Sequence, residues 1–127
     1  MRKREVIRYA ILSGLVVFFA VSCKYDDVLP PPPPENVSFS EDIIPIFNSS
    51  CNLAGCHNAS GHVPDLSPAN AYDDLWNGMY IDTMVPEDSE LYMWMAGLRG
   101  LPMPVEGVNN GYTSTVLEWI RSGAPNN

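Results

Sequence analysis

Five consecutive prolines at positions 30–34 limit what this chain can fold into more than any other feature. Proline has a fixed φ angle and no backbone N–H, so such a run enters neither a helix nor the interior of a sheet. It favours an extended polyproline II spacer that rises about 3.1 Å per residue. We therefore expect a linker over residues 23–36 and one folded domain over residues 37–127, which is enough chain for a single small core.

The segment before this linker has the composition of an export signal. Residues 1–8 hold four basic side chains and one acidic one, and residues 9–21 are almost continuously apolar. This is the order of a secretory signal, and the apolar run is shorter than the roughly 20 residues that a membrane-spanning helix needs. Small residues precede Cys23, which resembles the bacterial lipobox. The sequence predicts a lipoprotein signal peptide over residues 1–22 and a lipidated Cys23, with an ordinary signal peptide as the alternative.

The segment CNLAGCH at positions 51–57 has the most specific chemistry in the chain. A cysteine pair followed directly by histidine is the pattern that attaches haem through two thioethers, with the histidine ligating iron. The usual spacing is two residues, whereas four residues separate Cys51 from Cys56. Because Cys56 and His57 are adjacent, the ligand keeps its place relative to one thioether, and the extra residues can bulge outward at turn-prone positions such as Gly55.

Two other interpretations of the same residues stay open. In an exported domain, Cys51 and Cys56 could form a disulfide with His57 incidental, and a lipidated Cys23 would leave no odd thiol. A zinc site could be drawn from both cysteines, His57 and His62, although the spacing is unusual for zinc.

Acidic residues dominate the part of the chain that would remain after removal of the signal. Lys+Arg falls from 7 to 3 and Asp+Glu from 15 to 14, so the mature net charge is 3 − 14 = −11. Nucleic acid is therefore not expected as a partner, because binding to it depends on cationic side chains. A protein partner with a basic docking face is favoured.

Helical signals predict an all-α domain with long loops. Apolar residues recur at helical spacing in four short segments, which are residues 40–48, 68–76, 89–96 and 113–122. Their expected N-caps are Ser40, Ser67, Ser89 and either Thr113 or Ser114. No stretch alternates over strand lengths. Loops this long in so small a domain are easier to accept if they surround a cofactor.

The order of motifs from residue 37 onward resembles a class of small c-type cytochrome domains found in lipoproteins of Bacteroidota. The matching segments are VSFS at 37–40, IPIF at 44–47, Cys-x4-Cys-His at 51–57, AYDDL at 71–75, SELY at 89–92, Met-Pro at 103–104 and WIRSGA at 119–124. These motifs occur in the family's order and cover the domain. The four-residue spacing between the cysteines is part of the family pattern.

The resemblance implies a small cytochrome c-like domain around one covalently bound haem c. Cys51 and Cys56 would carry the thioethers and His57 would be the proximal iron ligand. Met103 would be the distal ligand, where a thioether raises the haem potential. Rival ligand candidates in the sequence are His62, Met79, Met84, Met93 and Met95. The aromatic residues expected around the haem or between helices are Phe47, Tyr72, Tyr92, Trp94 and Trp119.

The implied function is transfer of single electrons between redox proteins by a membrane-anchored carrier, not an enzyme. Two protein ligands would leave no iron position for a substrate. One alternative is a haem-free interaction module of a surface lipoprotein with a Cys51–Cys56 disulfide, and the other is a peroxidase-like enzyme in which Met103 is displaced from iron. We also expect Pro64 near His57 and a backbone carbonyl that accepts the His57 ring N–H, as is usual for iron-ligating imidazoles.

Overall fold

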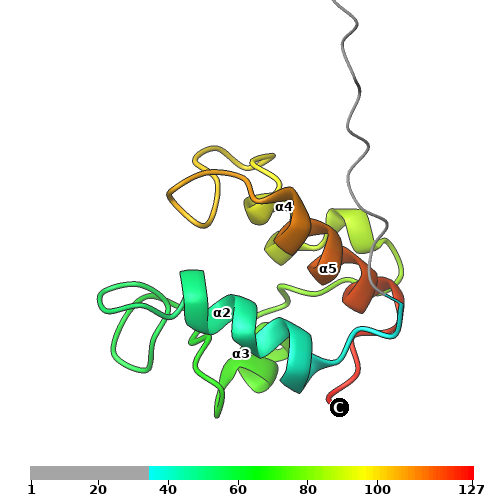
Figure 1. Cartoon of the computed structure of the whole chain (residues 1–127), viewed down its shortest axis with the longest axis horizontal. Helices are drawn as coiled ribbons and strands as arrows, with labels where there is room; N and C mark the ends of the chain where they lie inside the picture. Colours follow the sequence, from blue (N-terminus) through cyan, green and yellow to red (C-terminus); the bar gives the residue numbers. More distant parts are fainter. Residues whose placement is uncertain (1–34) are drawn as a thin grey trace, which may run out of the picture.

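Helices and loops make up residues 35–127, the part of the chain that the computed structural model describes (Figure 1). In chain order, the elements are the π-helix η1 (Phe39–Ile43), α2 (Ile44–Ser50), α3 (Ala71–Asn77), the 3₁₀-helix η2 (Pro86–Asp88), α4 (Glu90–Met95) and α5 (Asn110–Arg121). No strand occurs in this part of the chain. The prediction of a small all-helical domain with about four helices is therefore confirmed. The predicted signal peptide, Cys23 and the proline run lie outside the described residues.

None of the helices within residues 35–127 has the length and apolar character needed to cross a membrane.

The first helical segment begins earlier than predicted. Ser38, and not Ser40, is its N-cap, and the Ser38 hydroxyl accepts a hydrogen bond from the Glu41 N–H at 3.3 Å. The π-turn of η1 passes directly into α2, which places Pro45 in the first turn of α2. A proline is tolerated there because the N–H that it lacks would have no partner within the helix.

Two further helix starts differ from the prediction in opposite directions. Residues 68–70 form a turn, so α3 begins at Ala71, whose N–H donates to the Ser67 carbonyl at 2.9 Å. Helix α5 begins at Asn110 because Asn109 is its N-cap and accepts from the Tyr112 N–H at 3.1 Å. The predicted caps of α5, Thr113 and Ser114, were wrong.

Ser89 precedes α4 as predicted, but its side chain does not cap the helix. The Ser89 hydroxyl instead accepts from the Asp82 N–H at 2.9 Å and donates to the Asp82 carbonyl at 3.2 Å. With only 1% of its surface exposed, Ser89 ties the loop before η2 to the start of α4.

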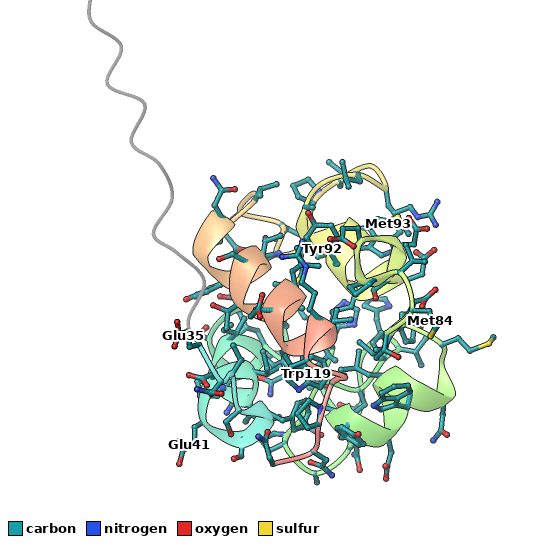
Figure 2. All side chains as sticks on the ribbon, turned by 90° about the vertical axis from the view of Figure 1, so that its right-hand side faces the viewer. Glu35, Glu41, Met84, Tyr92, Met93 and Trp119 are labelled. Carbon is teal, nitrogen blue, oxygen red and sulfur yellow. The ribbon has the colours of Figure 1, made fainter. Side chains whose placement is uncertain are left out.

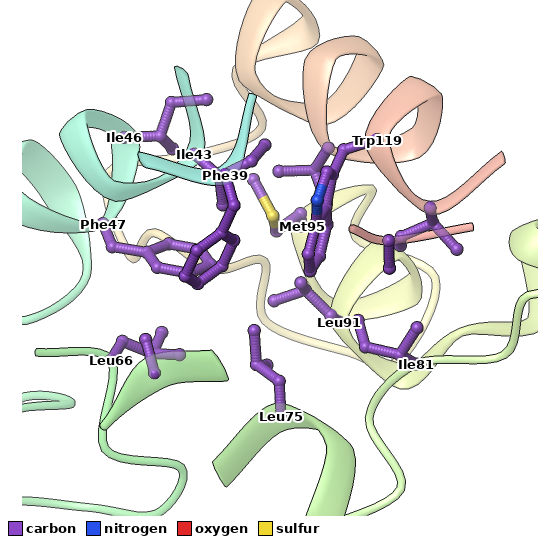
Figure 3. Close-up of a cluster of buried hydrophobic side chains, with 14 of the residues drawn as sticks. Phe39, Ile43, Ile46, Phe47, Leu66, Leu75, Ile81, Leu91, Met95 and Trp119 are labelled. Carbon is purple, nitrogen blue, oxygen red and sulfur yellow. The ribbon is translucent and has the colours of Figure 1, made fainter. Parts of the chain in front are cut away.

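The core forms where η1, α2, α3, α4 and α5 meet, and aromatic rings fill its centre (Figure 3). Phe39 lies between the rings of Trp119 at 5.2 Å, Tyr72 at 5.3 Å and Phe47 at 6.5 Å, measured between ring centroids. The polar tips are satisfied, since Trp119 Nε1 donates to the Pro125 carbonyl at 2.9 Å. Such aromatic pairs contribute stability beyond the area that they bury.

The loops after α2 and after α4 extend from the same side of the domain (Figure 1). The chain enters at residue 35 on the other side, close to the C-terminus. There the Asn127 carbonyl accepts from the Ser40 N–H at 2.9 Å, and its side-chain oxygen accepts from the Phe39 N–H at 2.8 Å. The two ends of the domain are thus joined away from the loops that carry the candidate site residues.

Candidate functional site

Two pockets of about 290 Å³ each adjoin between the loop after α2 and the loop after α4. The first, the cysteine pocket, is lined by both Cys51 and Cys56. The second, the aromatic pocket, is lined by Tyr80 and Trp94 together with apolar side chains. Cys51, His57 and Met103 line both pockets, so residues far apart in the sequence meet at one place.

Cys51 is held in place by the end of α2. Its N–H donates to the Phe47 carbonyl at 2.9 Å, and only 8% of the residue is exposed. The following loop closes on itself, because the His57 N–H returns to the Cys51 carbonyl at 3.0 Å. Between the cysteines, residues 53–55 are exposed, and Gly55 has a φ of 79°, which favours glycine. The extra residues therefore bulge outward, as expected.

The His57 ring is oriented by the loop that follows it. Its Nδ1 atom lies 3.2 Å from the Pro64 carbonyl oxygen. A carbonyl can only accept, so Nδ1 carries the proton of this hydrogen bond and the lone pair of a neutral ring is on Nε2. Two backbone bonds of 2.8 Å hold the loop, from the His62 N–H to the Cys56 carbonyl and from the Leu66 N–H to the His57 carbonyl. The expected carbonyl partner of His57 is thereby identified as that of Pro64.

Met103 reaches the same place from the loop after α4. Its N–H donates to the Trp94 carbonyl at 3.0 Å, which ties this part of the loop to α4. Met103 is half-buried, and the Pro104 that follows it is buried. The loop contact thus brings a thioether sulfur to the pockets that hold His57.

The rival ligand candidates are placed differently. Met79 and Met84 are 82% and 89% exposed and line none of these pockets, and Met84 extends away from the domain in Figure 2. Met95 is a buried core residue that also borders the aromatic pocket. The exposed His62 lines the cysteine pocket. Met103 is the one methionine among residues 35–127 that lines both pockets.

Cys51 and Cys56 have free thiols. Burial is the main cause that raises the pKa of the Cys51 thiol from 9.0 to about 11, and the nearby Cys56 and Glu106 side chains contribute to the same rise. Among residues 35–127, no three His, Cys, Asp or Glu side chains are grouped so that they could hold a metal ion. The structure therefore does not assemble the zinc site that the sequence allowed.

Apolar side chains form an exposed rim around the two pockets. Val63 and Val105 are 78% and 72% exposed, and Leu53 and Trp94 are partly exposed beside them. Exposed apolar surface of this kind, concentrated at a pocket, is typical of a site that an apolar ligand or partner covers.

Positive charge is scarce and already engaged in the described part of the chain. Residues 35–127 contain twelve acidic residues and two arginines, so their net charge is 2 − 12 = −10. Arg99 pairs with Glu90, and Arg121 pairs with Glu87. Neither arginine lines the cysteine pocket or the aromatic pocket.

The aromatic residues divide between the core and the site. Phe47 and Trp119 are fully buried in the core, Tyr72 packs against it, and Trp94 lines the aromatic pocket. Tyr80 also lines that pocket, although nothing in the sequence singled it out, because one aromatic residue in a loop has no period to recognise.

Comparisons with protein-family models, curated proteins and solved structures found no match to this chain.

Proposed function

We propose that this domain is a small c-type cytochrome that carries single electrons between redox proteins. The observation that carries the proposal is the meeting of Cys51, His57 and Met103 at two adjoining pockets. A thiol, an imidazole and a thioether, separated by up to 52 positions in the sequence, are the side-chain types that attach and ligate haem. The exposed apolar rim is the surface that a large flat apolar group would cover.

Cys51 and Cys56 would hold one haem c through thioethers, and His57 Nε2 and the Met103 sulfur would ligate its iron. When bound, haem iron supplies the one-electron change between ferric and ferrous states. The Pro64 carbonyl would fix the tautomer and orientation of His57 and leave its Nε2 free to ligate iron. The Trp94 carbonyl holds the backbone of Met103, and a thioether ligand raises the potential.

A carrier accounts for these residues better than an enzyme does. His57 and Met103, which hydrogen bonds to the Pro64 and Trp94 carbonyls already hold, would both ligate the iron, so no position would be left for a substrate. The acidic surface suits a redox protein with a basic docking face, and such association weakens as salt rises. Export and lipid anchoring through Cys23 belong to the same proposal and are supported by the sequence.

Covalent haem is the first thing to test. The chain would be expressed with haem-attachment machinery in an exported form and examined as its pyridine haemochrome. We expect one haem per chain held by two thioethers, and a single thioether when either Cys51→Ser or Cys56→Ser is introduced. His57→Ala should reduce the haem content at least tenfold, whereas His62→Ala, a matched change in the same loop, should leave it unchanged. A purified protein without a Soret band would favour the haem-free module.

The distal ligand has a separate test. Ferric haem with a methionine ligand has a weak near-infrared band that arises from the sulfur–iron bond. Met103→Ala should abolish this band, whereas Met84→Ala, at a fully solvated methionine, should retain it. A band that persists in Met103→Ala would disprove the assignment, and ready binding of cyanide by the unmodified protein would favour the peroxidase-like alternative.

A further inference from the structure

A third pocket, the polar pocket, adjoins the cysteine pocket and has no part in holding the haem in the proposed function. Its volume is about 690 Å³, more than twice that of either other pocket. It lies where the end of α2, the loop after α4 and the start of α5 meet. Ser50, Pro104 and Glu106 line both the polar pocket and the cysteine pocket. A group bound in the polar pocket would therefore lie next to the candidate haem site.

Glu106 gives the polar pocket its charge. It is the one carboxylate among the residues that line the three pockets, and no arginine or lysine lines any of them. Within residues 35–127, the salt bridges of Arg99 and Arg121 are to other glutamates. Glu106 is exposed, so a cation from solution can reach it. Charge complementarity therefore favours a basic ligand and disfavours an anion.

Two helix ends also reach the polar pocket, and their partial charges oppose each other. Ser49 and Ser50 are the last residues of α2, where the helix dipole is negative, and Asn110 is the first residue of α5, where it is positive. Each helix end is equivalent to about half an elementary charge. Because these two contributions offset each other, the full charge of Glu106 determines the sign of the pocket.

The rest of the lining suits the head and the stem of a lysine side chain. An ammonium group has three donors and no acceptor, so it needs several oxygen atoms around it. The Ser49 hydroxyl donates to the Ile46 carbonyl at 2.9 Å and can still accept, and Ser50, Asn109 and Asn110 add further oxygen acceptors. The Tyr112 ring adds apolar surface for the methylene stem of a long basic side chain.

The charge of Glu106 also acts on the cysteine pocket. Burial is the main cause of the raised pKa of the Cys51 thiol, and the Glu106 charge contributes to the same rise. His57 and Met103 line this pocket with Glu106. A change in the charge at Glu106 should therefore be felt where the iron ligands meet.

We propose that the polar pocket binds a lysine side chain from the basic face of the redox partner, with Glu106 as its counter-ion; this rests on the proposed function. Net charge alone favours a basic partner, whereas the polar pocket gives that partner a place on the surface. Docking there brings the partner beside the loop that contains Met103. A bound ammonium group offsets the Glu106 charge, which favours the ferrous state, so docking raises the midpoint potential.

The test is calorimetric titration of the haem-loaded protein with tetralysine, a peptide that carries the proposed ligand group. At about 0.15 M salt, exposed charges more than about 8 Å apart are largely screened, so distant glutamates contribute little. Glu106→Gln should weaken binding about fivefold, as for an ion pair that is open to solvent. Glu41→Gln is the matched control, because it removes the same charge from η1, on the side where the chain enters (Figure 1). It should change the affinity less than twofold.

A redox titration gives a second readout of the same site. Tetralysine should raise the midpoint potential of the unmodified protein and of Glu41→Gln, and should have little effect on Glu106→Gln. Glu106→Gln alone should have a higher potential than the unmodified protein, because the negative charge near the iron ligands is lost.

The outcomes separate the two proposals. A chain with no covalent haem overturns the proposed function. A haem-loaded Glu106→Gln protein that binds tetralysine as tightly as the unmodified protein overturns this inference alone. Equal weakening in Glu106→Gln and Glu41→Gln also overturns it, since binding would then reflect general acidity and not the polar pocket. Equal binding of a tetralysine peptide with acetylated side chains would overturn it too, because that peptide has no side-chain charge.

Discussion

The Nδ1 atom of His57 lies 3.2 Å from the carbonyl oxygen of Pro64, seven residues further along the chain. The loop between them is closed by the backbone bond from His62 to Cys56. One short segment therefore contains both the imidazole and the group that orients it. A change that moves this loop should alter the orientation of the imidazole without replacing His57 itself.

Gly61→Ala is the sharpest test of this loop. A Cβ atom at position 61 would lie 1.8 Å from the Cys56 carbonyl oxygen, so the backbone has to move. We expect the free energy of unfolding to fall by about 1–3 kcal/mol, as for other overpacked sites. The midpoint potential of the haem-loaded protein should change as well, because the Pro64 carbonyl moves away from His57.

The control for this variant is Ser60→Ala, at the neighbouring exposed position of the same loop. It removes a hydroxyl whose only partner is the Asn58 side chain in an exposed hydrogen bond, and its free energy of unfolding should stay within about 0.5 kcal/mol of the unmodified value. Urea unfolding and redox titration of both variants provide the comparison. Equal behaviour of the two variants would show that the loop adjusts without cost.

Phe47→Ala should destabilise both the core and the site. Phe47 is fully buried, its ring packs against Phe39, and its carbonyl accepts the N–H of Cys51. Loss of a buried phenylalanine typically costs about 3–5 kcal/mol, a large part of the stability of a small domain. Urea unfolding followed by tryptophan fluorescence measures this cost. Phe47→Leu should cost clearly less, and equal losses in both variants would contradict an explanation based on the cavity.

Ser89→Ala should cost about 1–3 kcal/mol, because the Asp82 N–H, which donates in a part-buried hydrogen bond, loses its acceptor on the buried Ser89. The loop before η2 should then be less protected, which amide hydrogen exchange at Asp82 would detect. Ser114→Ala is the comparison, since the Ser114 hydroxyl bonds only the Gly111 carbonyl on the exposed side of α5. If both serine variants were equally stable, the buried hydroxyl would have no structural role.

The two cysteines should differ in reactivity in the haem-free chain. With a pKa of about 11, the Cys51 thiol is ionised in about one molecule in a thousand at pH 8. We expect iodoacetamide to label the half-buried Cys56 first and Cys51 only after unfolding or at strongly alkaline pH. Peptide mass mapping of the time course reads out the order, and equally fast labelling of both thiols would contradict the burial of Cys51.

The raised pKa of the Cys51 thiol also determines in which direction the free energy of unfolding changes with pH. A thiol whose pKa is higher in the folded state favours folding as long as it stays protonated in both states. This contribution is complete below about pH 9 and is lost as the pH rises toward about 11. The haem-free chain should therefore lose stability over this alkaline range, and Cys51→Ala should remove that part of the pH dependence.

Local signals in the sequence predicted where the helices lie but not where each one begins. The segments around Ile44, Leu75, Leu91 and Trp119 have apolar residues at helical spacing, and each is helical in the structure. At α5, the Asn109–Gly111 segment has the composition of a turn, whereas the Asn109 side chain caps a helix that is already formed there. Several residues nearby can cap equally well, so the choice depends on packing elsewhere.

The candidate site, like the helices, was predictable from the sequence only where neighbouring residues determine its structure. The loop from Cys51 to His57 and its outward bulge follow from spacing and turn chemistry. The contact of Met103 with Trp94, the carbonyl partner of His57 and the place of Tyr80 depend on how separate loops meet. No period or motif in the sequence encodes these contacts.

The burial of Cys51 has a consequence for the order in which such a protein matures. Cys51 directly follows the last residue of α2 and is only 8% exposed, whereas Cys56, in the same loop, is half-buried. If both are joined to haem, the Cys51 thiol has to be reached through the two pockets that it lines, whereas Cys56 is also partly open to solvent. Access through these pockets would then decide the order in which the two bonds form.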